Sequence, residues 1–314
     1  MKYSKINFQY SACRYSSSKN LSRLQRIGAI FGYALWVCLH KRRALAQNKI
    51  QTQLDLSPSN ALDIAYNSFL HAGRSFSEIL VTRAVDHRFM NSRVRLLNPK
   101  NIHTMTSIPR PIIATTAHLG AWELMAGILR ISFQGRRSQI IVKGLKNKKF
   151  QKALTALRQI GAVEIIQSKN AASQVLPALR RDNGVSAFLV DHHTRRSKAM
   201  FLPFLSEPAT VNFGPALLAL RSNALVWPIF MVRSHPGHFN LHSFPALDTA
   251  TLQGTLRDKL KTIVSFYTLA VEKMVRSYPE QWFWMHNRWR SQPRGEEIVD
   301  PSLYQVKKEQ LINP

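Results

Sequence analysis

The alternation of strand-like and helix-like segments constrains the fold of this chain more than any other feature of its sequence. From residue 111 onwards, short apolar runs rich in β-branched residues are followed repeatedly by segments whose apolar residues recur at helical spacing. The strand-like runs are residues 111–117, 139–143, 163–167, 185–191 and 224–232, and the helix-like runs are residues 122–131, 147–160, 171–182, 213–222 and 252–278. Such repeated units build a largely parallel sheet with helices on both faces. We therefore expect an α/β fold with a mostly parallel mixed sheet.

The first strand-to-helix junction carries the main candidates for chemistry. His118 follows the run 111–117, Gly120 supplies a turn, and Glu123 falls in the first turn of the next helix. Five positions apart, the two side chains would lie on different faces of one helix, so they can meet only because the chain changes structure between them. Ligands and catalytic groups concentrate at this edge of open α/β sheets. Glu123 could accept a hydrogen bond from one nitrogen of His118 and leave the other free as a general base.

The same pair also has a structural interpretation, which the two residues alone favour. His118 would be a buried histidine at a strand end, and Glu123 would complement the helix dipole. Asp191 also ends a strand-like run, so we expect it to line the same crevice. His192 and His193 follow it, but adjacent residues of an extended chain point to opposite faces, and no further ligand stands at a familiar zinc spacing. With no glycine-rich phosphate loop either, we predict no metal and no cofactor site.

The charge of the chain restricts its partners. Its 314 residues include 44 Lys and Arg against 17 Asp and Glu, a formal net charge of +27. Such a field favours nucleic acid, an anionic membrane or an acidic protein or substrate. The basic residues are scattered and no nucleic-acid-binding signature is present, so we expect no nucleic acid. In the basic stretch 143–152, Lys146 and Lys149 could contact phosphates or an acidic carrier protein, or could only solvate a helix start.

The N-terminal part predicts a membrane contact. Residues 27–39 form the only long uncharged apolar stretch and have basic flanks, but they fall short of the roughly 18–20 residues needed to span a bilayer. An interfacial or partly inserted helix, with its flanks at anionic headgroups, explains this pattern better than a buried core helix does. Residues 57–85 should form a second helix, capped at Ser57 or Ser59 and broken near Gly73.

Two later segments combine large apolar side chains with prolines or basic residues. Residues 200–220 predict a proline-punctuated loop running into a helix, and its apolar side chains would line an acyl-chain groove or belong to the core. Residues 278–290, with three tryptophans, should pack in the core, and Arg288 or Arg290 could stack on aromatic rings. Arg158, near the end of its helix, could favour the helix C-terminus or contact an anionic substrate.

In this order, the motifs resemble the bacterial lipid A biosynthesis acyltransferase family, within the wider lysophospholipid acyltransferase group. AHLGAWE is similar to the family signature of a histidine, four residues and an acidic residue. The later blocks follow in the family's order, namely LRQIG, LVDHHTRR, FLPFLSEPATVNFGPALLAL and PEQWFWMHNRW. The resemblance covers about residues 27–293, and ordered blocks are far more specific than one motif, so the catalytic interpretation of His118 and Glu123 becomes the favoured one.

The resemblance implies an αβα acyltransferase fold at the cytoplasmic face of the inner membrane. Acyl carrier protein or coenzyme A thioesters would be donors, and a hydroxyl of a lipid A precursor or related glycolipid would be the acceptor. His118 would remove the proton from that hydroxyl, Glu123 would orient and charge-stabilise His118, and no covalent intermediate would form. Arg158 and Asp191 fall where the family has a functional arginine and aspartate, so we expect them to bind substrate.

One departure keeps alternatives open. The family usually has glutamine and then a glycine-containing turn after the aspartate, whereas His192, His193 and Thr194 follow Asp191 here. The acceptor could therefore be a lysophospholipid or aminolipid, or the chain could be an inactive basic membrane-binding homologue. We expect a poorly ordered basic tail over residues 1–20, a membrane-associating helical segment over 21–56, an acyltransferase domain over 57–295 and a C-terminal tail over 296–314.

Overall fold

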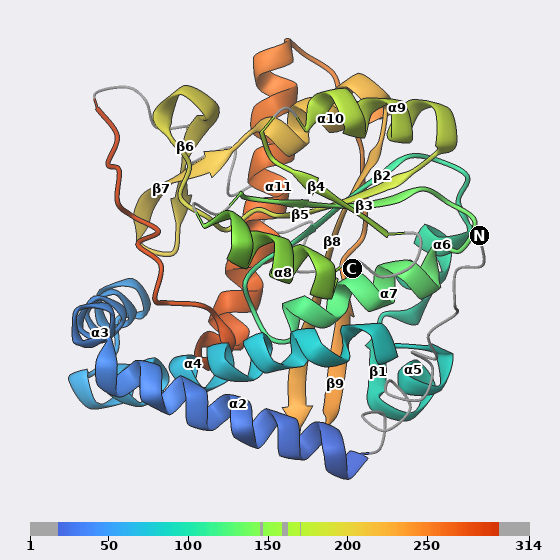
Figure 1. Ribbon diagram of the computed structural model, residues 1–314. Coiled ribbons are helices and arrows are strands. Elements are labelled where there is room, and N and C mark those ends of the chain that lie inside the picture. The colour runs from blue at the N-terminus through green and yellow to red at the C-terminus, as the bar shows by residue number, and fades with distance from the viewer. Residues whose placement is uncertain (1–17, 145–146, 159–162, 170, 295–314) are drawn as a thin grey trace.

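The computed structural model of the protein describes residues 18–144, 147–158, 163–169 and 171–294 (Figure 1). Its strands are β1 (Val94–Leu97), β2 (Ile112–Thr116), β3 (Ser138–Val142), β4 (Val163–Gln167), β5 (Val185–Leu189), β6 (Ala199–Phe204), β7 (Glu207–Asn212), β8 (Leu225–His235), β9 (His238–Ser243) and β10 (Leu247–Asp248). Its α-helices are α2 (Ser18–Cys38), α3 (His40–Leu54), α4 (Pro58–Glu78), α5 (His87–Arg93), α6 (Pro99–Ser107), α7 (Met125–Ser132), α8 (Lys148–Arg158), α9 (Ala172–Asp182), α10 (Gly214–Ser222) and α11 (Leu256–Ser277). Short 3₁₀ helices include η1 (Ile79–Ala84), η2 (Trp122–Leu124), η3 (Arg196–Lys198), η4 (Thr249–Thr251) and η5 (Pro279–Gln281).

The central sheet is mostly parallel. Within the described ranges it has eight strands in the order β1-β9-β8-β2-β5-β3-β4, with β10 also beside β8. β2 runs parallel to β5 and β8, and β3 runs parallel to β4 and β5. β9 turns back antiparallel to β8 and pairs in parallel with β1. The expected α/β fold with a mostly parallel mixed sheet is therefore confirmed.

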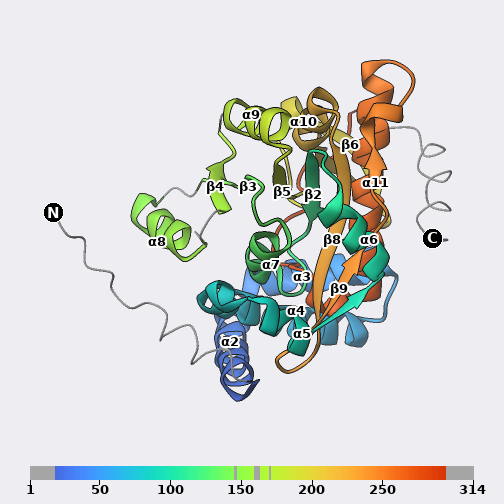
Figure 2. The ribbon, with the colours of Figure 1, turned by 90° about the vertical axis from the view of Figure 1, so that its right-hand side faces the viewer.

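Alternate residues of the central strands face two separate cores. Ile113 of β2 and Phe230 of β8 belong to the core that includes α9, α10 and α11. Ile112 and Trp227, on the same two strands, belong to the core that includes α7 and η1. Figure 2 shows α7 and α11 on opposite sides of these strands. Burial on both faces explains why the strand segments read as continuous apolar runs.

The segment before α10 is a β-hairpin, so the loop expected at the start of residues 200–220 is wrong. β6 pairs antiparallel with β7 around a turn in which Leu205 has φ 60°. Pro203 and Pro208 lie opposite each other, and a two-stranded sheet tolerates them because each strand keeps a free edge for the missing N–H. Leu202 and Phe204 are fully buried, so these side chains belong to the core.

The two N-terminal helices approach each other unusually closely. A Cβ added to Gly73 of α4 would lie 2.1 Å from the carbonyl oxygen of Gly28 and 2.5 Å from the amide nitrogen of Gly32, both in α2. Gly73 therefore permits close packing, and the break expected there is absent, since α4 continues to Glu78. The cap is confirmed, because the Ser57 side chain accepts a hydrogen bond at the first turn of α4.

The outer face of α2 is apolar and exposed. Ile27, Ile30 and Phe31 are 62%, 69% and 50% exposed, and Leu80 of η1 is 56% exposed. None of the helices in the described ranges combines the length and apolar character that a bilayer crossing requires. The tails expected at residues 1–20 and 296–314 lie outside the described residues, except for residues 18–20 at the start of α2.

Candidate active site

His118 and Asp191 meet at the ends of two neighbouring parallel strands. His118 follows β2 and Asp191 follows β5, and the register pairs Thr116 with Leu189 just before them. Oδ1 of Asp191 lies 2.9 Å from Nδ1 of His118, and the backbone N–H of His118 donates to Oδ2 at 2.9 Å. Asp191 and His118 therefore meet at the strand ends where the sequence pattern placed them, with Asp191 buried beneath the histidine.

The environment of Asp191 keeps its carboxylate ionised. The residue is 1% exposed, and Nε1 of Trp282 donates a hydrogen bond to its Oδ2 at 2.9 Å. Burial alone would raise the pKa of Asp191, but the charge of His118 and the hydrogen bond from its ring lower it well below the ordinary value of 3.8. An ionised carboxylate can only accept, so the Nδ1 atom of His118 must carry a hydrogen.

The second ring nitrogen of His118 faces accessible space. Its side chain is 16% exposed, and Nε2 has no hydrogen-bond partner in the described part of the chain. When the ring is neutral, with Nδ1 protonated and held by Asp191, Nε2 is an acceptor. The pair thus has the geometry of a general base and the carboxylate that orients it.

Glu123 does not occupy the position beside His118 that the sequence suggested. Arg158 binds it in a bidentate ion pair, from Nη2 to Oε1 at 2.6 Å and from Nε to Oε2 at 3.0 Å. Nε1 of Trp122 also donates to Oε1 at 3.2 Å. The carboxylate that contacts His118 is that of Asp191, because β5 lies directly beside β2, whereas η2 directs Glu123 towards the end of α8.

The ion pair brings two predicted site residues together. Burial alone would lower the pKa of Arg158, but the hydrogen bonds and charge of Glu123 outweigh it and raise that pKa. Glu123 is 5% exposed, whereas the Arg158 side chain remains 27% exposed. Arg158 is thus held in one orientation and still reaches solvent, as a contact to an anionic group requires.

Backbone hydrogen bonds and a close backbone approach fix the turn after His118. Gly120 has φ 62°, and a Cβ there would lie 2.1 Å from the carbonyl oxygen of Met231. Its N–H donates to the carbonyl of Gln281 at 3.0 Å, and the N–H of Phe283 donates to the carbonyl of His118 at 2.9 Å. The tryptophan-rich segment expected to pack in the core therefore also clamps the histidine turn.

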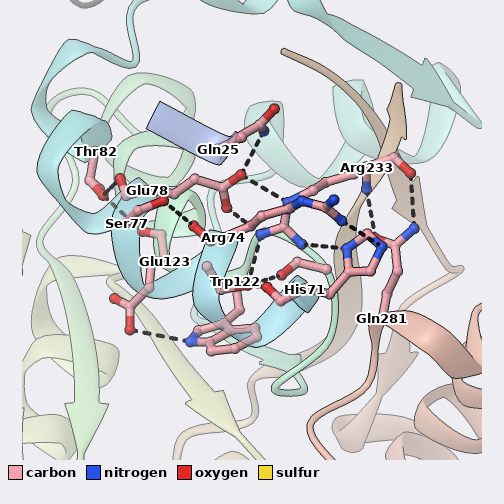
Figure 3. A network of polar contacts seen from close by, with 12 residues as sticks. Gln25, His71, Arg74, Ser77, Glu78, Thr82, Trp122, Glu123, Arg233 and Gln281 are labelled. Carbon is pink, nitrogen blue, oxygen red and sulfur yellow. Dashed lines mark hydrogen bonds and ion pairs between the residues drawn. The ribbon is translucent and has the colours of Figure 1, made fainter. Parts of the chain in front are cut away.

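A buried polar network that joins Gln25, Glu78 and Arg233 (Figure 3) is linked to this turn by a hydrogen bond. Arg233 of β8 donates to Glu78 of α4 through Nε at 2.9 Å and through Nη2, and the two side chains are 5% and 0% exposed. Nη2 of Arg233 also donates to the Ser75 hydroxyl, which donates to the carbonyl of Gly120 at 2.7 Å. Gln25 of α2 donates to Glu78 at 2.8 Å, so the N-terminal helix is joined to the same network.

Two further histidines lie at the site. The ring of His192 is 4.0 Å from that of His118, and Nε2 of His286 lies 3.2 Å from the carbonyl oxygen of Asp191. Burial is the main cause that lowers the pKa of His192 to about 3 and that of His286 to about 4. His193 pairs with Ser291, and it lines the same groove as His192, although adjacent residues of an extended chain were expected to point to opposite faces. The described residues contain no group of His, Cys, Asp and Glu able to hold a metal ion.

A groove of about 480 Å³ opens beside His192. Arg42, Lys143 and Arg290 line it, together with apolar side chains. The sequence pattern did not assign these cations to one place, although each stands in a basic or aromatic stretch that it had singled out. Of the two predicted lysines, Lys149 is exposed on α8, and Lys146 lies outside the described residues.

Comparison with known proteins agrees with the geometry. The family model for bacterial lipid A biosynthesis acyltransferases matches residues 21–291. Over 107 residues the chain is 29% identical to the lipid A biosynthesis lauroyltransferase of Escherichia coli (strain K12). That match spans 33% of this chain and 33% of the relative's length. Because the family match includes the strands, the histidine turn and the tryptophan-rich segment, the chain belongs to the bacterial lipid A biosynthesis acyltransferase family.

Proposed function

We propose that the protein transfers a fatty acyl chain from a thioester to a hydroxyl group of a lipid A precursor or related glycolipid. The observation that carries this proposal is the buried, ionised Asp191 on Nδ1 of His118, with Nε2 left open. Membership of the lipid A acyltransferase family supports acyl transfer as the reaction class. The name of the matched lauroyltransferase suggests a related acceptor.

The mechanism uses His118 first as a base and then as an acid. Nε2 takes the proton of the acceptor hydroxyl while the oxygen attacks the thioester carbonyl carbon. The tetrahedral intermediate then expels the thiolate, which takes the proton from Nε2. Asp191 keeps the ring in the required tautomer and stabilises the imidazolium that forms between the two steps. No acyl–enzyme bond is needed.

Glu123 is assigned to a positioning role through Arg158. The bidentate ion pair fixes the guanidinium plane, and the partial exposure of Arg158 leaves it open to an anionic group of a substrate. Glu123 would therefore act on the reaction by orienting a cation and not by touching His118. Glu123 and Arg158 therefore both belong to the proposed site, but Glu123 is paired with Arg158 and not with His118.

We propose an acyl carrier protein or coenzyme A thioester as donor and the cytoplasmic face of the inner membrane as the place of action. The net charge of +27 suits an acidic carrier protein and anionic headgroups. The exposed apolar face of α2, with Ile27, Ile30 and Phe31, suits insertion into the headgroup region. The helical segment 21–56 would then be the membrane-associating part, and residues 57–295 the acyltransferase domain.

A matched pair of histidine variants tests the reaction. We expect His118→Ala to lower acyl transfer from an acyl carrier protein thioester by about 10²–10⁴, the usual contribution of a general base. His103→Ala removes an exposed histidine of α6 and should leave the rate unchanged. The lipid mass spectrum of cells with and without the gene would report the acyl chain and acceptor. Full activity of His118→Ala would rule out this mechanism.

A further inference from the structure

The groove beside His192 has the lining of an anion-binding site. Arg42 comes from the start of α3, Lys143 follows β3, and Arg290 lies beyond η5, so three distant segments deliver cations to one place. No Asp or Glu is among the described residues that line it. None of the three cations forms an ion pair with a carboxylate in the part of the chain that the structure describes. A weak hydrogen bond joins Nη1 of Arg42 to the carbonyl of Met285 at 3.4 Å.

The positive charges near the groove lower the pKa values of His192 and His193. Lys143 is among the charges that lower the pKa of His192, after burial and the charge of His118. Burial and then the charges of Arg290, Arg288 and Lys143 lower the pKa of His193. Both rings are therefore neutral near pH 7 and can donate or accept hydrogen bonds, while the cations provide the charge. An anion entering this groove would be attracted by the three cations that line it.

The groove lies next to the reacting centre. His192 lines it and lies 4.0 Å, ring to ring, from His118. Phe283 lines it as well, and its ring is 6.2 Å from that of His118. An anionic group bound in the groove would therefore place the rest of its molecule near His118.

Part of the remaining lining is apolar, which favours an amphiphile as the ligand. Leu39, Phe283 and Met285 contribute to the groove, and Leu39 directly follows α2 and is 39% exposed. Arginine recognises phosphate by bidentate hydrogen bonds, and lysine adds a point charge. A phosphate attached to an apolar chain fits this combination better than a free inorganic ion does.

We propose that Arg42, Lys143 and Arg290 bind a phosphate group of a substrate in this groove, next to the atoms that react at His118. The part that this phosphate site plays in the reaction rests on the proposed acyl transfer. The phosphate belongs either to the headgroup of the acceptor lipid or to the arm that carries the donor thioester. Both sources share the same recognition chemistry.

A binding experiment tests the site apart from the reaction. Inorganic pyrophosphate serves as the probe, and its Kd is measured by calorimetry at fixed ionic strength for wild type, His118→Ala and the double variant Arg42→Gln/Arg290→Gln. We expect wild type and His118→Ala to bind equally and the double variant to bind at least about tenfold more weakly, since two charge-assisted contacts are lost. Arg257→Gln/Lys259→Gln, which removes the same charge from α11, is the control. Equal weakening in the control would overturn the proposal, because it would reflect net charge alone.

Kinetics then distinguish the two sources. One arm compares an acceptor lipid with its dephosphorylated form, and the other compares a carrier-protein thioester with a phosphate-free acyl-N-acetylcysteamine. We expect Arg42→Gln/Arg290→Gln to raise KM about tenfold for the phosphate-bearing member of one pair and to leave its phosphate-free counterpart unchanged. The affected pair identifies the source. Unchanged KM values in both pairs would overturn the assignment. If Arg42→Gln/Arg290→Gln weakens pyrophosphate binding but the wild-type protein shows no acyl transfer, the binding site stands and only the proposed function is contradicted.

Discussion

Replacing Asp191 with asparagine keeps the shape of the side chain but removes its negative charge and turns one acceptor oxygen into an NH₂ donor. Oδ2 of Asp191 accepts from the His118 backbone N–H and from Nε1 of Trp282, and Oδ1 meets Nδ1 of His118, all at 2.9 Å. If the amide oxygen of Asp191→Asn takes the Oδ2 position, both fixed donors keep their acceptor. The opposite orientation would set the amide NH₂ against two N–H groups, so we expect the first.

In that orientation the amide NH₂ faces Nδ1 of His118. Nδ1 must then accept, the ring proton moves to Nε2, and the nitrogen that should take the hydroxyl proton already carries one. In a Ser-His-Asp triad, changing the aspartate to asparagine lowers kcat by about 10⁴ through the same wrong tautomer. A general base contributes about 10²–10⁴, so we expect Asp191→Asn to lower kcat by that factor, or about 3–5.5 kcal/mol of barrier. KM should change little, because no substrate contact is removed.

The assay is acyl transfer measured as kcat and KM, together with the ¹⁵N NMR shifts of the His118 ring. Wild type should show a proton on Nδ1, and Asp191→Asn should show it on Nε2. Asp63→Asn, an exposed carboxylate of α4, is the matched control and should behave as wild type. An Asp191→Asn enzyme that keeps more than about a tenth of kcat, or keeps the proton on Nδ1, would refute the tautomer mechanism.

Further predictions concern stability and membrane binding. Arg233→Met leaves the fully buried Glu78 without its ion-pair partner, while Gln25 still donates to it, and should cost ~3–5 kcal/mol. For 314 residues this is a drop of about 5–8 °C in Tm, and unchanged thermal unfolding would contradict it. Ile30→Glu on the exposed face of α2 should weaken binding to anionic vesicles by about tenfold or more, whereas Leu256→Glu on α11, where the leucine is 60% exposed, should not. Denaturant stability should fall as pH decreases from 6.5 towards 4, because the unfolded chain then binds protons that the folded chain does not. The groups responsible are three histidines whose pKa values are lowered to about 2, 3 and 4, namely His71, His192 and His286. Equal or greater stability at pH 5 would contradict this sign.

The sequence alone predicted the elements whose signal is local. β2, β3, β4, β5 and β8 were all recognisable from apolar runs, because a strand buried on both faces needs no partner information to be read. Helices α9, α10 and α11 were predicted from apolar spacing in the same way. The β6–β7 hairpin and β9 were missed, because prolines and alternating polar residues acquire strand geometry only through pairing with a specific neighbour.

In the candidate site, too, the sequence predicted the local features and the tertiary structure decided the contacts. The sequence placed His118 and Asp191 at strand ends and Glu123 at a helix start, since each position follows from the pattern of its own segment. It did not determine which carboxylate contacts His118, because that depends on β5 lying beside β2, with 73 residues separating the two side chains. The sheet order also directs Glu123 to Arg158, and the packing of α3, β3 and the tryptophan-rich segment gathers the three groove cations. Hydrophobic periodicity is a property of neighbours in the chain, whereas hydrogen-bond partners and charge clusters arise from contacts between distant segments, which only the tertiary structure decides.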